Sequence, residues 1–580
     1  TECKSLNLRL INFLRDRAQV EKLVHYVIDE APEDADQTRK IKFPIMARTI
    51  LTCEVEIILR TLVEDEELMN LLFSFLKPGH SRDTNFAVHF SRVVECLMFH
   101  KVTPLVRYFQ GHPEIFHELV DLIGIASIKE VLIQLIGADS KKDAFSPPAE
   151  LVHLLEEIDL LEAILDKFSS SDSSIVQANA TNILCAIIDY APSQIAAKIY
   201  SPSFVRRLFD HALNDSQPIK TVLIQSLAVF ISLLDSERLA SASNQLRTNN
   251  SSHRSLVTTS HETVECMLES LGNLLELLDI SSSGDSLPTT YGSLKPPLGR
   301  YRVKIVEFIS VLLRIGSEVA EKKLLHLKAI KHVLDLFFEY PFNNVLHRHV
   351  VEIVVSCLDS KNTKLTEHLF FECDILGRIL EAEKQPTLSS DCNKPTVSTP
   401  GKSPPRKGNF GHLTQIANKI VELADKNSFI QTRLKENKEW SDWQNSVLFE
   451  RNKLENVRLW ECGHPRLSQG QALESDDEDQ DRKNAVAELA TELSRAFRYG
   501  IFSIDDIEEA QRSLEQEDAE AKYFDDESAD AVISSLRWVD GQEGSLFTNS
   551  NWFAFEDATG VANDRSSDSV SSPSSKSDGT

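Results

Sequence analysis

The segment KFPIMARTILTCEVEIILRTLVEDEELMNLLFSFLK, residues 42–77, sets the predicted fold of this chain. Two apolar stripes at helical spacing run through it: Ile57, Ile58, Thr61 and Leu62, then Leu68, Leu71, Leu72, Phe75 and Leu76. A single helix cannot bury either stripe, so each one needs neighbouring helices. Similar stripes recur along most of the chain, which predicts an all-α architecture of stacked helix pairs.

Turns fall every few tens of residues, a spacing typical of HEAT-like or armadillo-like repeats, although no strict period can be assigned. We therefore predict an all-α, HEAT/armadillo-like helical solenoid. Residues 1–235 are its first part, residues 298–383 its second part, and residues 410–462 its C-terminal helices. The clearest helix covers 127–137, where Gly137 stands at the position of a C-cap.

The remaining segments lack this periodicity. Residues 236–297 are predicted to be disordered insertions that flank one helix, and residues 384–409 an exposed linker rich in proline, serine and threonine. Residues 463–580 are predicted to be an acidic, largely disordered tail with two amphipathic helices and a short aromatic motif. The tail is the part of the chain least suited to a packed core.

The net charge of −26 is concentrated in the tail, where residues 471–580 hold 27 acidic and 9 basic residues. This balance disfavours nucleic acid as a partner, because each phosphate contact needs a cation. No apolar run is long enough to predict membrane insertion. The nine cysteines never form a CxxC pair, which favours a reducing compartment. We expect a cytoplasmic protein with access to the nucleus, and the missing initiator Met suggests that earlier residues are absent.

A search for enzyme motifs finds none, so the sequence predicts no catalytic, cofactor-binding or metal-binding residues. Gly401-Lys402-Ser403 resembles the end of a phosphate-binding loop, but Thr396 replaces the required glycine and Pro404 would block the following helix. His347 and His349 are two residues apart, so on a helix they point in different directions. We interpret them as exposed or capping histidines.

Three features have both a structural and a binding interpretation. The acidic cluster Glu64–Glu67 is either a docking edge for a partner or, as we favour, a solvated helix start stabilised by the helix dipole. Trp440, Trp443 and Trp460 either anchor a partner or, as we favour, lie in the core or cap the end of the solenoid. The tail aromatics are candidates for a docking motif that orders on binding or for a local contact with the body: Phe547, Trp552, Phe553 and Phe555.

Three hydroxyl residues are candidate phosphorylation sites. Thr399 and Ser403 each precede a proline, as proline-directed kinases require, and Ser475 precedes an acidic run. Phosphorylation would add a charge of about −1.5 to −2 at each residue. The alternative is that these are ordinary Ser-Pro and acidic segments of an exposed chain.

Five blocks of sequence carry a resemblance to a known family: residues 6–34, 42–76, 89–101 (HFSRVVECLMFHK), 116–139 (FHELVDLIGIASIKEVLIQLIGAD) and 411–422 (GHLTQIANKIVE). In order and spacing they resemble the SAPS family, the phosphatase-associated proteins that act as regulatory subunits of protein phosphatase 6. The resemblance covers roughly residues 2–450. The tail segment 532–557 is similar to the plant branch of that family.

The resemblance implies a non-enzymatic scaffold that binds a phosphatase 6-type catalytic subunit and modulates its activity, targeting or substrate choice. A further regulatory subunit is a candidate second partner. The likeness is densest between Phe43 and Asp139, so we expect the catalytic subunit to contact that region. Two alternatives remain open at this point: a trafficking or transport adaptor with a HEAT-like body, and an enzyme with an unrecognised site.

Overall fold

The computed structural model describes most of the chain up to residue 465. The described residues are 7–457, 460–461 and 464–465, without residues 33, 80–82, 142–144, 170–172, 215–219, 236–259 and 281–285. The chain divides into two compact units, Thr1–Gly463 and His464–Thr580. In the described part of the first unit most residues are helical, which confirms the predicted all-α class.

The N-terminal helices are α1 (Leu8–Leu14), α2 (Arg17–Ile28), η1 (Thr38–Lys42), α3 (Phe43–Leu51), α4 (Glu56–Glu64), α5 (Glu66–Phe73), η2 (Ser74–Leu76), α6 (Thr84–His100), α7 (Val102–Gly111), α8 (Glu114–Asp121) and α9 (Ala126–Ile136). The middle helices are α10 (Ala149–Glu157), α11 (Leu160–Asp166), α12 (Ser174–Tyr190), α13 (Ser193–Ile199), α14 (Pro202–Leu213), α15 (Thr221–Leu234), α17 (His261–Glu269) and α18 (Leu271–Glu276). The C-terminal helices are α19 (Arg300–Arg314), α20 (Glu318–His326), α21 (Ala329–Glu339), α22 (Asn344–Asp359), α23 (Thr363–Phe371), α24 (Ile375–Lys384), α25 (Phe410–Ala424), α26 (Ser428–Glu436), α27 (Lys438–Trp443), η3 (Gln444–Leu448) and α28 (Phe449–Val457).

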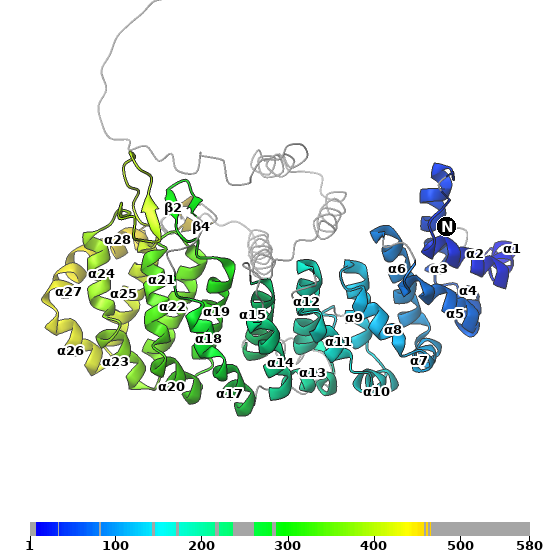
Figure 1. Cartoon of the computed structure of the whole chain (residues 1–580), viewed down its shortest axis with the longest axis horizontal. Coiled ribbons are helices and arrows are strands. Elements are labelled where there is room, and N and C mark those ends of the chain that lie inside the picture. Colours follow the sequence, from blue (N-terminus) through cyan, green and yellow to red (C-terminus); the bar gives the residue numbers. More distant parts are fainter. Residues whose placement is uncertain are drawn as a thin grey trace, which may run out of the picture. The chain divides into compact units, whose positions relative to one another are not determined.

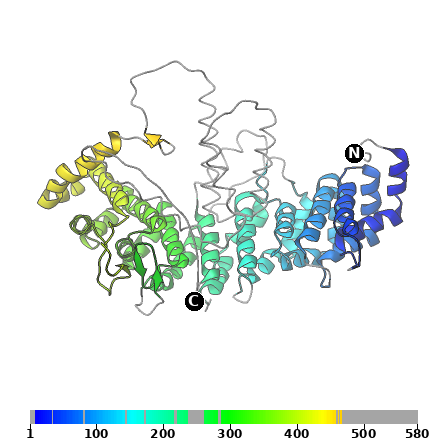
Figure 2. The same cartoon turned by 90° about the horizontal axis from the view of Figure 1, so that it is seen from above.

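These helices form a solenoid with two layers. One layer consists of α3, α6, α9, α12, α15, α19, α22 and α25, each of which contacts the next. The second layer runs beside it, with contacts such as α10 to α13, α14 to α17, α17 to α20 and α20 to α23. Figures 1 and 2 show the helices of this unit following one another in chain order. The apolar stripes of both layers meet between them, which is where the core lies.

Ion pairs between successive repeats reveal the period that the sequence alone did not give. Lys167 Nζ lies 2.7 Å from Asp121 Oδ1, 46 residues earlier. Lys101 pairs with Glu56 across 45 residues, and Arg378 pairs with Asp335 across 43 residues. Each basic residue therefore reaches back by one structural unit, and separations of 43–46 residues agree with a HEAT-type repeat.

The helix boundaries follow the sequence signals closely. The apolar periodicity predicts helices over about 174–190 and 202–213, and the structure confirms both as α12 and α14. Gly137 ends α9 in the left-handed conformation, with φ of +75°, as its position predicts. The first stripe of the opening segment is displaced by one residue, since Ile58, Leu59 and Leu62 are the buried residues of α4.

The predicted exposed linker, residues 384–409, is instead partly built into the fold. It contributes β3 (Thr396–Ser398), which pairs antiparallel with β2 (Gly292–Leu294), and β2 pairs with β1 (Leu287–Pro288). Gly292 allows this close approach, because a Cβ there would lie 1.9 Å from Val397 O. The described part of the predicted insertion 236–297 thus also forms regular structure.

Hydrogen bonds hold this segment against the helices, and its composition does not reveal them. Thr396 Oγ1 donates to Glu339 O at 2.6 Å, and Tyr340 Oη donates to Pro296 O at 2.8 Å. These bonds satisfy carbonyl groups at the end of α21 and just after β2. They need no periodic apolar residues in the segment. Leu388 adds a buried apolar contact. The short strands β4 (Trp460–Glu461) and β5 (His464–Pro465) complete the described elements.

No helix among the described residues has the length and apolar character that a membrane span requires.

Candidate partner-binding surface

The N-terminal helices expose an apolar face within the region expected to bind a partner. η1 continues directly into α3, and one side of α3 is buried through Pro44, Ala47 and Leu51. The opposite side carries Ile41, Ile45 and Met46, which are 48%, 41% and 60% exposed. We call these three residues the α3 face. A helix that is apolar on both sides is normally covered on both sides.

Basic side chains border the α3 face. Lys42 and Arg48 take part in no ion pair among the residues that the structure describes. The Arg39 guanidinium lies 5.6 Å from the centre of the Tyr26 ring, which in turn packs edge-on against Phe43. In a chain of net charge −26, an apolar face bordered by cations suits an acidic partner surface with apolar side chains.

The exposed apolar residues concentrate at this end of the solenoid. Among the described residues, six of the 14 large apolar side chains that are exposed fall between Ile41 and Phe99. The sequence contained a signal for the α3 face, because KIKFPIMARTIL places apolar residues on every side of a helix. Apolar stripes predict which residues are buried, but they do not predict that the α3 face stays uncovered.

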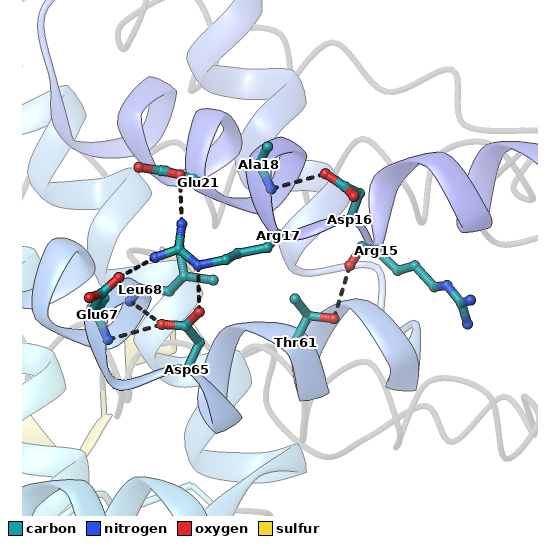
Figure 3. A network of polar contacts seen from close by, with 9 residues as sticks. All are labelled: Arg15, Asp16, Arg17, Ala18, Glu21, Thr61, Asp65, Glu67 and Leu68. Carbon is teal, nitrogen blue, oxygen red and sulfur yellow. Dashed lines mark hydrogen bonds and ion pairs between the residues drawn. The ribbon is translucent and has the colours of Figure 1, made fainter.

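A polar network around Arg17 fixes the helices that support the α3 face (Figure 3). Arg17 Nε donates to Asp65 Oδ2 at 2.7 Å and Nη1 to Glu21 Oε2 at 3.1 Å, and Nη2 donates to Glu67. Thr61 Oγ1 donates to Arg15 O at 3.0 Å. The network therefore links the start of α2 to α4 and to the start of α5.

Asp65 has two roles in this network. Its Oδ1 accepts from the backbone N–H of Glu67 at 3.0 Å and of Leu68 at 3.2 Å, so Asp65 is the N-cap of α5. Desolvation acts to raise its pKa, but the hydrogen bond from Arg17 and the two backbone donors together hold the pKa of Asp65 below its ordinary value. The carboxylate is thus kept ionised for both roles.

The acidic cluster Glu64–Glu67 is confirmed as a helix start from Asp65 onward. Glu66 and Glu67 occupy the first turn of α5, where the helix dipole favours them. Glu64 instead ends α4, so the cluster spans two helices. The docking interpretation of its exposed carboxylates stays a prediction.

Two sequence interpretations in the C-terminal half have opposite outcomes. His347 is fully buried, so the prediction of an exposed or capping residue is wrong. Its Nε2 donates to Tyr340 O at 2.8 Å, and burial lowers the pKa of His347 to about 4. His349 is half-buried beside Glu352.

Trp440 and Trp443 are buried and in contact, which confirms their core role, whereas the side chain of Trp460 lies outside the described residues.

Two of the candidate phosphorylation sites lie among the described residues and the third lies outside them. Thr399 is half-buried and Ser403 is exposed, and both follow β3. Ser475 lies outside the described residues, and so do the tail aromatics Phe547, Trp552, Phe553 and Phe555. The docking role of the aromatic group therefore stays a prediction.

Among the residues that the structure describes, neither the cavity beside α13 nor the metal-ligating side chains supply a competing site. A cavity of about 280 Å³ lies among α10, α11, α13 and α14, lined in part by Leu155, Lys198 and Phe204. Lys198 Nζ donates to Glu156 O at 2.6 Å, so this amine is engaged by the fold. Within the described residues, no group of three or more His, Cys, Asp or Glu side chains is arranged to hold a metal ion.

Comparison with known proteins identifies a family and relatives of this chain. The family model described as SAPS, SIT4 phosphatase-associated protein, matches residues 94–457. Serine/threonine-protein phosphatase 6 regulatory subunit 3 of Gallus gallus is 28% identical over 517 residues, covering 82% of this chain and 56% of the relative. Regulatory subunit 1 of Mus musculus is 28% identical over 539 residues, covering 86% of this chain and 60% of the relative.

A solved structure of importin beta aligns with 74% of this chain and 50% of its own, at 13% identity and a TM-score of 0.34. The fold assignment rests on the helix contacts of this chain itself. The chain spans 56–60% of the length of the two phosphatase regulatory subunits. Because the family model covers more than half of its residues, this chain belongs to the SAPS family of SIT4 phosphatase-associated proteins.

Proposed function

We propose that this chain is a regulatory and scaffold subunit that binds a protein phosphatase 6-type serine/threonine phosphatase catalytic subunit and modulates its activity, targeting or substrate choice. The observation that carries the proposal is the family match over residues 94–457, together with relatives whose names state this role. The trafficking-adaptor alternative receives no support from these relatives. The chain itself supplies no catalytic residue in this proposal.

The α3 face is the proposed core of the contact with the catalytic subunit. Ile45 and Met46 lie inside the region Phe43–Asp139, where the family resemblance is densest, and Ile41 adjoins it. The Arg17 network gives α2, α4 and α5 fixed positions, and α2 packs against α3. A rigid apolar centre with a charged rim is the arrangement that concentrates binding energy in an interface.

Binding of the recombinant full chain to a purified phosphatase 6-type catalytic subunit tests the proposal. The variant Ile45→Glu/Met46→Glu places two carboxylates on the α3 face. The matched control is Ile175→Glu, which changes a residue of α12 that is just as exposed. We expect the double variant to weaken binding tenfold or more, about 1.4 kcal/mol, and the control to stay within about twofold.

The outcomes separate the two parts of the proposal. Failure of the unmodified chain to bind the catalytic subunit would refute the regulatory role. Equal binding by the unmodified chain and the double variant would keep the role and exclude the α3 face. A phosphopeptide assay with the purified chain alone should show no turnover, whereas the complex should be active.

The further aspects of this role are proposals of the same kind. A further regulatory subunit is expected in the complex, and the expected location is cytoplasmic with access to the nucleus. Fractionation of cells that express the tagged full chain, followed by mass spectrometry of the captured complex, would test both. Capture of the catalytic subunit without a third protein would contradict the first expectation.

A further inference from the structure

The segment after β3 presents a serine in a form that a kinase can reach. Lys402 N donates to Thr399 O at 3.2 Å, and the turn between them contains Pro400 and Gly401, whose φ is +77°. Proline followed by a left-handed glycine is typical of a type II turn. Ser403 comes directly after this turn, is exposed and lies outside any helix or strand.

The two Ser/Thr-Pro sequences here are therefore not equivalent. Thr399 is half-buried and its carbonyl oxygen closes the turn. Another proline-linked hydroxyl, Ser201, caps α14 by accepting from Phe204 N at 3.3 Å. A kinase needs a free hydroxyl on an extended chain, and of these three residues Ser403 alone offers it. Ser146, which precedes Pro147, is also exposed and outside any helix or strand, so the cations near Ser403 are what distinguish the two.

The same segment is a concentration of positive charge. Residues 392–408 contain Lys394, Lys402, Arg406 and Lys407 and no Asp or Glu. Among the described residues, none of these four cations forms an ion pair with a carboxylate. In a chain of net charge −26, four cations in one segment, none of them ion-paired among the described residues, favour an anion at this place.

The fold fixes two of these cations by direct contacts. Lys407 Nζ donates to Gln385 O at 2.7 Å, and the Arg406 guanidinium lies 4.7 Å from the centre of the Phe410 ring. Burial lowers the pKa of Lys407 and the charge of Lys394 lowers it further, whereas the charge of Glu381 acts in the opposite direction. Lys394 and Lys407 therefore experience each other's charge although 13 residues separate them.

The backbone keeps this arrangement in register. Leu388 N donates to Pro405 O at 2.8 Å, and Lys407 N donates to Pro386 O at 2.9 Å. The segment thus folds back on itself beside the sheet, in the part of the chain next to β2 in Figure 1. Ser403 lies one residue from Lys402 and three residues from Arg406 within this rigid frame.

We propose that Ser403 is phosphorylated by a proline-directed protein kinase and that Lys402 and Arg406 retain the phosphate on the surface of the solenoid. In the transfer, Ser403 Oγ bonds to the γ-phosphorus of ATP, the bond to the β-phosphate oxygen breaks, and ADP leaves. The hydroxyl proton passes to the base of the kinase. In the product, the phosphate dianion accepts charge-assisted hydrogen bonds from Lys402 and Arg406.

The first experiment treats the full chain with ATP and a proline-directed kinase and measures site occupancy by mass spectrometry. We expect modification of Ser403, little modification of Thr399 or Ser201, and loss of the Ser403 phosphopeptide in Ser403→Ala. Modification of Thr399 or Ser201 with Ser403 left unmodified would overturn the proposal. Modification of the tail residue Ser572 with Ser403 left unmodified would overturn it equally.

The second experiment tests retention of the phosphate by ³¹P NMR titration. The second pKa of an exposed phosphoserine is about 6, and nearby cations favour the dianion and so lower it. We expect the pKa of phosphoserine 403 to lie at least roughly half a unit lower in the folded chain than in the same sample in urea. Lys402→Ala/Arg406→Ala should restore the urea value. An identical pKa in folded and denatured chain would contradict retention.

Discussion

Arg451 on α28 forms a bidentate ion pair with Glu383 on α24, with Nη1–Oε1 at 3.0 Å and Nη2–Oε2 at 3.1 Å. Nη1 also donates to Thr414 Oγ1 of α25 at 3.0 Å, so one guanidinium joins three helices. The two charged side chains are only 18% and 15% exposed. The planar guanidinium matches the two oxygens of a carboxylate, so this pair has a defined geometry as well as opposite charges.

Replacement of Arg451 should loosen the C-terminal end of the solenoid. Arg451→Ala leaves the Glu383 carboxylate largely buried without its partner, which costs about 1–3 kcal/mol. A solenoid unfolds in parts, so the loss should appear as faster hydrogen exchange in α25 and α28, with α6 to α12 unchanged. Lys453→Ala removes an exposed pair with Glu450 and should change exchange little. If Arg451→Ala and Lys453→Ala change hydrogen exchange equally, the buried ion pair of Arg451 with Glu383 does not stabilise this end of the solenoid.

His347 should make stability depend on pH between about 6.5 and 4. Burial, together with the charge of His412, lowers the pKa of His347 from 6.5 to about 4, with the Tyr340 carbonyl acting in the opposite direction. The unfolded chain therefore takes up a proton before the folded chain does. Stability is complete above pH 6.5 and falls as the pH drops toward 4, by up to about 3 kcal/mol.

His347→Gln isolates this effect, because glutamine can donate to Tyr340 O but does not titrate. Urea unfolding at pH 7 and pH 4.5 should show a smaller loss of stability in the variant than in the unmodified chain. Burial also lowers the pKa of His412, so part of the loss should persist until His412 is replaced as well. The same loss in both proteins would show that other groups cause the pH dependence.

The sequence predicted those elements whose burial leaves a periodic trace. The helices α12 and α14 have their predicted bounds, because each has an apolar stripe and a start signal, Ser173 or Ser201. The prediction of an exposed linker at 384–409 is wrong, because this segment is ordered by polar bonds to α21 and by backbone pairing with β2. Neither the polar bonds nor the backbone pairing requires apolar residues at a period of 2.0 or 3.6 residues.

The candidate sites show the same limit. A sequence does not show which apolar residues are left uncovered, since this depends on the neighbours that the fold supplies, so the α3 face was missed. The prediction of an exposed His347 fails because a histidine inside VLHRHVV can lie on either side of its helix. The region Phe43–Asp139 came from family resemblance alone, and only the structure distinguishes surfaces within it.

Gly137 should tolerate no side chain. Its φ of +75° costs an L-residue about 1–2 kcal/mol, and a Cβ would lie 2.5 Å from Pro147 Cδ. Gly137→Ala should therefore lower the free energy of unfolding of the surrounding repeats by at least about 1 kcal/mol, measured by urea unfolding. Gly272→Ala is the control, because that helical glycine has open space around it. It should be neutral or stabilising by up to about 1 kcal/mol.

Asp65 allows its two roles to be separated by two substitutions. Asp65→Asn keeps an oxygen that can cap α5 but removes the charge facing Arg17. Asp65→Ala removes both, and loss of the cap alone costs about 1 kcal/mol. Hydrogen exchange in the first turn of α5 should therefore accelerate in the alanine variant and much less in the asparagine variant. If the two variants behave alike, the Arg17 contact and not the cap dominates.

The charge role of Asp65 carries a pH signature of its own. Its pKa lies below the ordinary value of 3.8 in the folded chain, so the unfolded chain binds the proton first as the pH falls. The stabilising contribution of the carboxylate is present above pH 3.8 and disappears as the pH falls through the folded pKa. Asp65→Asn lacks this titration, and so the exchange rates of the α2 start should depend less on pH below 4 than in the unmodified chain. Because Arg17 links α2 to α5, a pH dependence confined to α5 would mean that Asp65 acts only as a cap and that the α3 face is held by other contacts.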